Sequence, residues 1–141
     1  MKAEYGIQLF SVRDLTEKSL PEAIQKIAAI GYKSVEFAGF FGHTPEQLLQ
    51  MTQENHVKIF GTHTGIGELV SDYEGTVAFH KALGNKNFII PHYADISNRE
   101  CLSKLINHVN YYQPLLEKEG IRLGFHNHAD EFTTGPDGIT P

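Results

Sequence analysis

The chain has 141 residues, of which 40% are hydrophobic and 21% charged, with a formal net charge of −5 and one cysteine, Cys101. This composition is typical of one globular domain over residues 1–141, and an acidic chain without a Lys/Arg run is not expected to bind nucleic acid. A lone cysteine excludes an internal disulfide, and no apolar stretch approaches the roughly 20 residues of a membrane span, so a cytoplasmic protein with no membrane association is expected.

The first two predicted strands lie on either side of a capped helix. Residues 5–12 form a run that predicts a strand, followed by a polar loop at residues 13–14. Residues 19–22, Ser-Leu-Pro-Glu, have the spacing of a capping box and predict a helix that ends at Gly31. Residues 34–38, Ser-Val-Glu-Phe-Ala, predict the second strand.

The middle of the chain repeats this alternation. Residues 44–47, Thr-Pro-Glu-Gln, form a second capping box with proline at the first helical position. A third strand is predicted to begin with residues 57–60 and to run into residues 61–65, Gly-Thr-His-Thr-Gly. A helix over residues 73–83 is expected to stop at Gly84, because glycine adopts the left-handed conformation that ends many helices.

The last third of the chain adds two more strands. Residues 87–91 predict the fourth strand, and residues 97–100, Ser-Asn-Arg-Glu, form a third capping box that opens a long helix ending at Gly120. The fifth strand is predicted over residues 121–125. The resulting order, βαβαβαβαβ, predicts a parallel sheet, which is either part of a (β/α)8 TIM barrel or the whole of a doubly wound sheet.

Polar side chains follow each of the five predicted strands. The carboxyl ends of parallel strands meet at one edge of the sheet, where the active sites of such folds lie. We therefore expect these side chains to face a common basin and to ligate metal, hydrogen-bond hydroxyl groups or move protons. The candidate residues are Gln8, Arg13, Glu36, His63, His92, His126, His128 and Glu131.

Each candidate taken alone also has a structural explanation. Gln8 and Glu36 could be buried polar groups that satisfy loop amides. Recurrence at five strand ends favours a functional explanation, because converging polar groups cost desolvation free energy unless they serve a ligand. The remaining histidines of the predicted helices and their ends are expected on the surface or in packing: His56, His80 and His108.

Three segments carry a resemblance to a known family. Residues 6–14 (Gly-Ile-Gln-Leu-Phe-Ser-Val-Arg-Asp), 30–39 (Ile-Gly-Tyr-Lys-Ser-Val-Glu-Phe-Ala-Gly) and 123–132 (Leu-Gly-Phe-His-Asn-His-Ala-Asp-Glu-Phe) resemble the signatures of the sugar phosphate isomerase/epimerase family. These are xylose-isomerase-like TIM barrels, related to endonuclease IV. The resemblance implies a divalent metal (Mn, Zn, Co or Mg) at the carboxyl rim and isomerisation or epimerisation of a small sugar or sugar phosphate through a metal-stabilised enediolate.

The resemblance also implies roles for the strand-end residues. The strand-five metal ligand best matches Glu131, and an alternative alignment gives metal or substrate binding to His126 or His128. Glu36 is expected to hydrogen-bond the substrate or to orient a histidine. The implied catalytic residues are Glu36, His63 and His92. The implied substrate-binding residues are Gln8, Arg13, His126 and His128.

The sequence departs from the family in length. A complete (β/α)8 barrel needs about 250 residues, whereas this sequence stops just after its fifth predicted strand. The expectation is therefore a fragment, a truncated reading frame, or a homo-oligomer in which another copy covers the open sheet edges. Two functions remain open: an isomerase or epimerase, seen here as its amino-terminal portion, which could lack activity as this short chain, and a non-catalytic ligand-binding or assembly module. The acidic charge disfavours the endonuclease branch.

Overall fold

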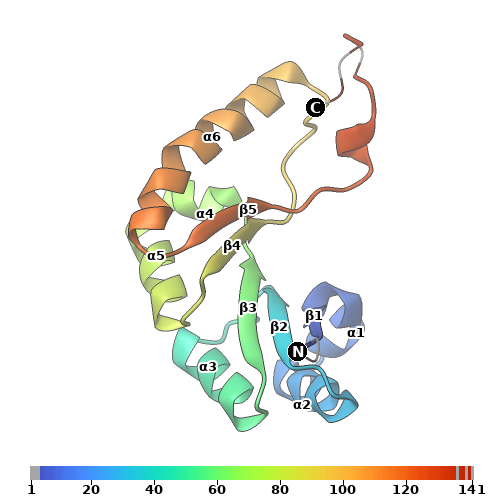
Figure 1. Ribbon diagram of the computed structural model, residues 1–141, viewed down its shortest axis with the longest axis vertical. Helices are drawn as coiled ribbons and strands as arrows, with labels where there is room; N and C mark the ends of the chain where they lie inside the picture. The colour runs from blue at the N-terminus through green and yellow to red at the C-terminus, as the bar shows by residue number, and fades with distance from the viewer. Residues whose placement is uncertain (1–3, 136, 139, 141) are drawn as a thin grey trace.

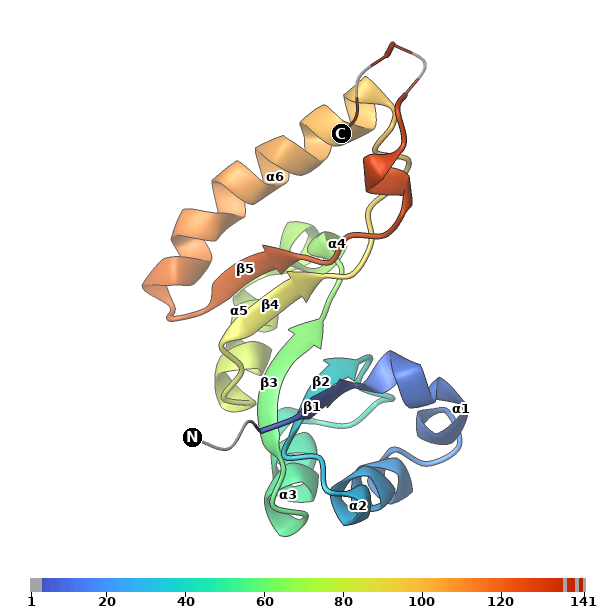
Figure 2. The same cartoon turned by 45° about the vertical axis from the view of Figure 1, so that its right-hand side comes forward.

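The computed structural model describes residues 4–135, 137–138 and 140, which contain one five-stranded sheet in the order β1-β2-β3-β4-β5. Each strand pairs in parallel with the next one in the sequence, and the strand arrows point the same way (Figure 2). The strands are β1 (Gly6–Gln8), β2 (Ser34–Ala38), β3 (Lys58–His63), β4 (Asn87–Ile90) and β5 (Arg122–Phe125). The predicted α/β architecture, a partial TIM barrel with successive parallel strands, is confirmed.

Helices connect the successive strands and pack along one side of the curved sheet (Figure 1). None of the helices in the described part of the chain combines the length and apolar character needed to cross a membrane. The α-helices are α1 (Arg13–Thr16), α2 (Leu20–Ile30), α3 (Pro45–Glu54), α4 (Ile66–Ser71), α5 (Tyr73–Ala82) and α6 (Arg99–Lys118). Two 3-10 turns are η1 (Leu9–Val12) and η2 (Asp130–Phe132).

The hydrophobic core lies between the sheet and these helices. Alternate residues of a strand face opposite sides of the sheet, and on β2 it is Val35 and Phe37 that are fully buried. Phe88 and Ile90 occupy the same side of β4 and are also fully buried. The other face of the sheet, called the inner face below, carries the remaining residues of these strands, which are only partly buried.

The first strand is shorter than predicted. β1 ends at Gln8, and the next four residues form η1, with the side-chain oxygen of Gln8 accepting a hydrogen bond from Phe10 N. Arg13, predicted in a loop, begins the short helix α1. Leu9 is apolar, as expected for a strand, but it is buried in the core from a turn. Burial of Leu9 therefore agrees with the predicted strand, whereas the prediction that residues 9–12 continue the first strand is wrong.

α4 and the cap of α6 differ from the sequence prediction, whereas β3 continues past Phe60 to His63 as predicted. α4 forms where the pattern predicts no helix. The cap of α6 is Asn98 rather than Ser97, since the Asn98 side chain accepts hydrogen bonds from the next two residues after Arg99 along the helix. Serine and asparagine cap helices about equally well, so the pattern alone cannot rank two such neighbours.

Replacing Thr44 with alanine is expected to lower the free energy of unfolding by about 1 kcal/mol. Thr44 Oγ1 accepts a hydrogen bond from Gln47 N, and Gln47 Oε1 accepts one from Thr44 N, so both halves of the predicted capping box are present at α3. Urea unfolding measures the change. Thr44→Ser keeps the hydroxyl group and should retain most of the stability, whereas equal losses in both variants would show that the hydroxyl does not stabilise the helix.

Candidate functional site

A hollow of about 680 Å³ opens where the strands end. Its wall comes from η1 and from the residues at or just beyond the ends of β1, β3, β4 and β5: Gln8, Phe10, Ser11, His63, Pro91, His92, His126 and His128. The structure thus brings together five of the residues that the sequence singles out: Gln8, His63, His92, His126 and His128. The volume lies within the range of small-molecule sites, roughly 300–1,000 Å³.

Gln8 and Glu36 lie side by side on the inner face. The register of β1 and β2 pairs the two residues directly. Glu36 stands between the buried Val35 and Phe37, so the alternation of β2 turns its side chain away from the helices. Glu36 lines an adjoining hollow of about 330 Å³, and Gln8 lines both hollows. Glu36 therefore lies next to the strand-end hollow, behind Gln8 and His63.

A one-residue bulge turns His63 toward the same inner face. The register between β2 and β3 shifts after Val35 and leaves Phe60 as the extra residue of β3. Such a shift reverses the alternation of the side chains that follow. Thr62 is consequently fully buried on the helix side, and His63 lines the hollow. Without the bulge, His63 would face the helices.

Contacts with β4 hold this bulge. The side-chain amide of Asn87 donates a hydrogen bond to the carbonyl oxygen of Phe60, the extra residue. Gly61 follows, where a Cβ atom would lie 3.1 Å from the carbonyl oxygen of Asn87 and 3.2 Å from Ile89 Cδ1. The absence of a side chain at Gly61 therefore lets β3 approach β4 closely at the position where the register changes.

His63 lies between Gln8 and Glu36. Gln8 Nε2 is 3.0 Å from His63 Nδ1, and His63 Nε2 is 2.8 Å from Glu36 Oε1. The side chains of His63 and Glu36 are only 10% and 15% exposed. The 2.8 Å contact is close but not aligned as a hydrogen bond, which leaves His63 Nε2 as a buried polar atom without an aligned partner among the described residues. An unmet buried group of this kind is costly unless it serves a ligand or a reaction.

Burial sets the protonation of the His63–Glu36 pair. It raises the pKa of the Glu36 carboxyl above its ordinary 4.5, with His126 opposing the shift. It also lowers the pKa of His63 below 6.5, and the neighbouring His126 and His128 lower this pKa further. A charged ion pair would move the two pKa values in the opposite directions. At neutral pH His63 is therefore the neutral partner of Glu36.

Three further histidines, which are more exposed than His63, lie next to this pair along the wall of the hollow. The ring centroids of His63 and His126 are 4.9 Å apart, and those of His126 and His128 are 4.7 Å apart. The His92 ring lies 6.1 Å from that of His128. His126 N donates a hydrogen bond to the carbonyl oxygen of Ile90, so β5 still pairs with β4 where the histidine segment begins. The hollow is thus lined by imidazoles that can donate or accept hydrogen bonds.

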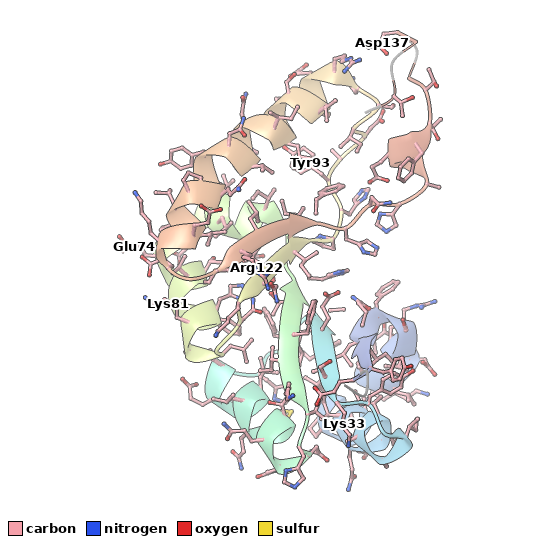
Figure 3. All side chains as sticks on the ribbon, viewed as in Figure 1. Lys33, Glu74, Lys81, Tyr93, Arg122 and Asp137 are labelled. Atoms are coloured by element: carbon pink, nitrogen blue, oxygen red, sulfur yellow. The ribbon has the colours of Figure 1, made fainter. Side chains whose placement is uncertain are left out.

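The side chain of Arg13, the predicted substrate ligand, contacts the preceding residues of η1 and does not line the hollow. Its Nη1 donates a hydrogen bond to the carbonyl oxygen of Phe10, and its guanidinium carbon lies 4.7 Å from the centre of the Phe10 ring. Lys33, just before β2, and Arg122, at the start of β5, lie away from the chain segment that follows β5 (Figure 3). No lysine or arginine is among the described residues that line the hollow.

Glu131, the predicted metal ligand, is bonded to its own loop. One carboxylate oxygen accepts a hydrogen bond from the backbone nitrogen of His128, and the other lies 4.0 Å from His128 Nδ1. The Glu131 side chain is not among the residues that line the hollow. Its position is explained by these local contacts between residues three apart in the sequence.

The described side chains do not by themselves form the divalent metal site that the resemblance implies. Zinc sites use three or four protein ligands that converge on one point. Within the residues that the structure describes, no group of three or more His, Cys, Asp or Glu side chains has that arrangement. No chemical step is therefore assigned to a Mn, Zn, Co or Mg ion.

A buried polar network behind the hollow has no obvious signal in the sequence. His80, expected in packing or on the surface, is 1% exposed, and its Nδ1 lies 3.1 Å from Asn85 Nδ2 and 3.5 Å from Thr62 Oγ1. Burial lowers the pKa of His80 to about 4, so the ring is neutral in the folded protein at pH 7. The surrounding aromatic rings are those of Phe40, Phe79 and Phe88.

Comparisons with known proteins identify similar solved structures. No protein-family model matches the chain, and no curated protein sequence matches it significantly. A sugar phosphate isomerase/epimerase from Parabacteroides distasonis has a TM-score of 0.78 at 22% identity over 94% of this chain. A second sugar phosphate isomerase/epimerase from that organism gives 0.79 at 18% identity over 100% of this chain. A xylose isomerase-like TIM barrel/4-hydroxyphenylpyruvate dioxygenase fusion protein gives 0.67 at 19% identity, over 89% of this chain and 22% of its own length.

These similarities establish the fold alone, which is part of a TIM barrel with five parallel strands. Sequence identities of 18% to 22% do not by themselves establish an activity. The chain spans 57% of the length of each of the two isomerase/epimerase structures.

Proposed function

We propose that the strand-end hollow belongs to a site that isomerises or epimerises a small sugar or sugar phosphate. The observation that carries the proposal is the buried arrangement of Gln8, His63 and Glu36 beside a hollow of sugar-binding size. The similarity to two sugar phosphate isomerase/epimerase structures supports the same reaction class. Isomerisation and epimerisation through an enediolate both begin by removing a proton from the hydroxyl-bearing carbon next to the carbonyl.

Glu36 is the proposed proton acceptor. Its raised pKa makes the carboxylate a stronger base than an ordinary glutamate, and its 15% exposure leaves it accessible from the inner face. As the C–H bond next to the carbonyl breaks, its electron pair forms an enediolate and the proton moves to Glu36. Isomerisation is completed when that proton returns to the neighbouring carbon. Epimerisation is completed when a proton from another donor reaches the opposite face of the same carbon.

The imidazoles of the hollow are the proposed partners of the developing oxyanion. An enediolate oxygen is stabilised by hydrogen-bond donors that are already in place when the charge develops. His126, His128 and His92 line the hollow and supply ring nitrogens there. A neutral imidazole can also carry a proton between two neighbouring oxygens, which isomerisation requires.

Deuterium incorporation tests this proposal directly. The chain is incubated in D₂O with fructose, xylulose or fructose 6-phosphate, each with and without added Mn²⁺, and the recovered sugar is analysed by mass spectrometry. We expect at least one of these sugars to gain deuterium at the carbon next to the carbonyl faster than in a protein-free control. Incorporation equal to the control for all three sugars would contradict the proposed reaction and favour a non-catalytic module.

A different observation favours the assembly alternative. In the described part of the chain, β1 and β5 end the sheet and each has one strand neighbour. The side chains of Phe10, Phe60 and Phe125 are 59%, 56% and 36% exposed. Open strand edges and exposed aromatic side chains favour association, so this alternative is a homo-oligomer in which a second copy covers the sheet edges. Sedimentation equilibrium separates the cases, because a mass of one chain at every concentration would exclude this assembly.

A further inference from the structure

We infer that Gln8 is a positioning residue that holds His63 in the Nε2–H tautomer, so that the single ring proton of His63 lies on the nitrogen that faces the Glu36 carboxylate. Nothing in the fold alone decides which ring nitrogen of a histidine carries the proton, and that choice determines whether the residue acts as an acid or a base.

The orientation of the Gln8 side-chain amide is the first step. Gln8 Oε1 accepts a hydrogen bond from the backbone N–H of Phe10, so the Gln8 side chain caps η1. A backbone N–H can only donate, so the amide oxygen, and not the NH₂ group, must lie on that side. The NH₂ group of Gln8 is therefore the group that lies 3.0 Å from His63 Nδ1.

The tautomer of His63 follows from this orientation. An NH₂ group can only donate, so Nδ1 must offer its lone pair, and the single proton of the neutral ring lies on Nε2. Nε2 is the atom that lies 2.8 Å from Glu36 Oε1. In the other tautomer, an N–H would face the NH₂ of Gln8 and a lone pair would face the carboxylate, so both contacts would be repulsive. The lowered pKa of His63 agrees with a ring that stays neutral.

A similar amide lies in the core. Asn85 Oδ1 accepts the backbone N–H of Asn87, two residues later, as Gln8 Oε1 accepts that of Phe10. Asn85 Nδ2 lies 3.1 Å from His80 Nδ1, but its two protons also face Thr62 Oγ1 at 3.1 Å and the carbonyl oxygen of Asn87 at 3.0 Å. The Asn85 amide therefore does not fix the tautomer of His80. His80 lies in the core rather than in the wall of the strand-end hollow, so its signals report whether the fold is native.

The consequence for the site is a division of roles. With Nε2 protonated and Nδ1 engaged by Gln8, His63 has no free lone pair with which to remove a proton from a substrate. Glu36 is therefore the base of the pair, and the Nε2–H of His63 is available to donate a hydrogen bond to the Glu36 carboxylate. The tautomer assignment of His63 does not depend on the proposed sugar chemistry. The role of Glu36 as proton acceptor does depend on that proposed function.

Nitrogen NMR of the chain labelled with ¹⁵N-histidine tests the tautomer. Long-range ¹H–¹⁵N correlation at neutral pH distinguishes protonated, pyrrole-type nitrogens from unprotonated, pyridine-type nitrogens. We expect His63 to show a pyrrole-type Nε2 and a pyridine-type Nδ1. A pyrrole-type Nδ1 in His63 of the unaltered chain would overturn the inference, and this result requires no variant to fold.

Gln8→Glu supplies the matched test of cause. A carboxylate at this position can still accept the hydrogen bond from Phe10 N–H. Toward His63 Nδ1, however, the carboxylate can only accept a hydrogen bond, whereas the amide NH₂ of Gln8 donates one. We expect His63 Nδ1 to change from pyridine-type to pyrrole-type, while His80 keeps its pattern. An unchanged His63 in a variant whose His80 signals are native would show that Gln8 does not set the tautomer. Suppose that Gln8→Glu loses deuterium incorporation into the sugar while the His63 nitrogen signals stay unchanged. Gln8 would then affect the proposed reaction by a route other than the tautomer of His63.

Discussion

Glu36→Gln is expected to slow deuterium incorporation into a responsive sugar by about 10²- to 10⁴-fold, the usual contribution of a positioned general base. Glutamine keeps the size of the side chain and can still contact His63, but its amide cannot accept the proton from carbon. The rate is measured by mass spectrometry in D₂O, as for the unaltered chain. Binding of the sugar should change much less than the rate, because the amide preserves the shape of the inner face.

Glu17→Gln is the matched control for this variant. Glu17 follows α1, is exposed and takes no part in either hollow. It makes the same chemical change and alters the net charge equally, so it should leave the incorporation rate unchanged. If Glu36→Gln and Glu17→Gln exchange deuterium at the same rate as the unaltered chain, Glu36 is not the base.

Acidification is expected to destabilise the fold through His80. Burial lowers the pKa of His80 from 6.5 to about 4, so the unfolded chain binds a proton more readily than the folded one between these values. Both states leave His80 neutral above pH 6.5, and this residue then has no effect on stability. As the pH falls from 6.5 to about 4, the free energy of unfolding should decrease by about 3 kcal/mol from this group.

Urea unfolding at a series of pH values measures this effect, with His80→Gln as the comparison. The variant lacks the titrating ring, so its stability should depend less on pH across the same window, although it should be less stable at pH 7 because the ring packing is lost. The difference between the two pH profiles isolates His80 from the carboxylates that also titrate. Parallel profiles would show that His80 is not kept neutral by the fold.

Much of the fold could be predicted because its determinants are local. Thr44 caps its helix with both bonds of the predicted capping box, and the Ser19 hydroxyl accepts the predicted hydrogen bond from Glu22 N. Gly31 and Gly84 adopt positive φ values of 115° and 70° where the helices were predicted to end. Such features depend on residues three or four apart, which a single sequence displays directly.

The site could be predicted only in part, because some of its determinants are distant in sequence. The convergence of Gln8, His63 and the later histidines follows from parallel strands. The bulge that turns His63 inward depends on Asn87, which is 27 residues beyond Phe60. The sequence signal for such a bulge is Gly61, because a glycine inside a strand often marks one. Phe10 was missed as a wall residue because the strand was predicted to continue through it.

The role of Glu131 as a metal ligand stays a prediction from the resemblance. Glu131 follows the fifth strand, and one of its carboxylate oxygens accepts a hydrogen bond from the backbone nitrogen of His128 in the same loop. A motif specifies which residue types are present near a strand end. It does not specify which of several nearby partners a short acidic side chain will contact.

The most direct test of sugar binding in the strand-end hollow uses the eight histidines of the chain as reporters. Four line the hollow: His63, His92, His126 and His128. The other four, outside it, are His43, His56, His80 and His108. Histidine ¹⁵N spectra recorded during titration with xylulose should show shifts for the first four and none for the second four. Shifts confined to the second four, or none at any histidine up to the solubility limit of the sugar, would contradict a sugar site at these strand ends.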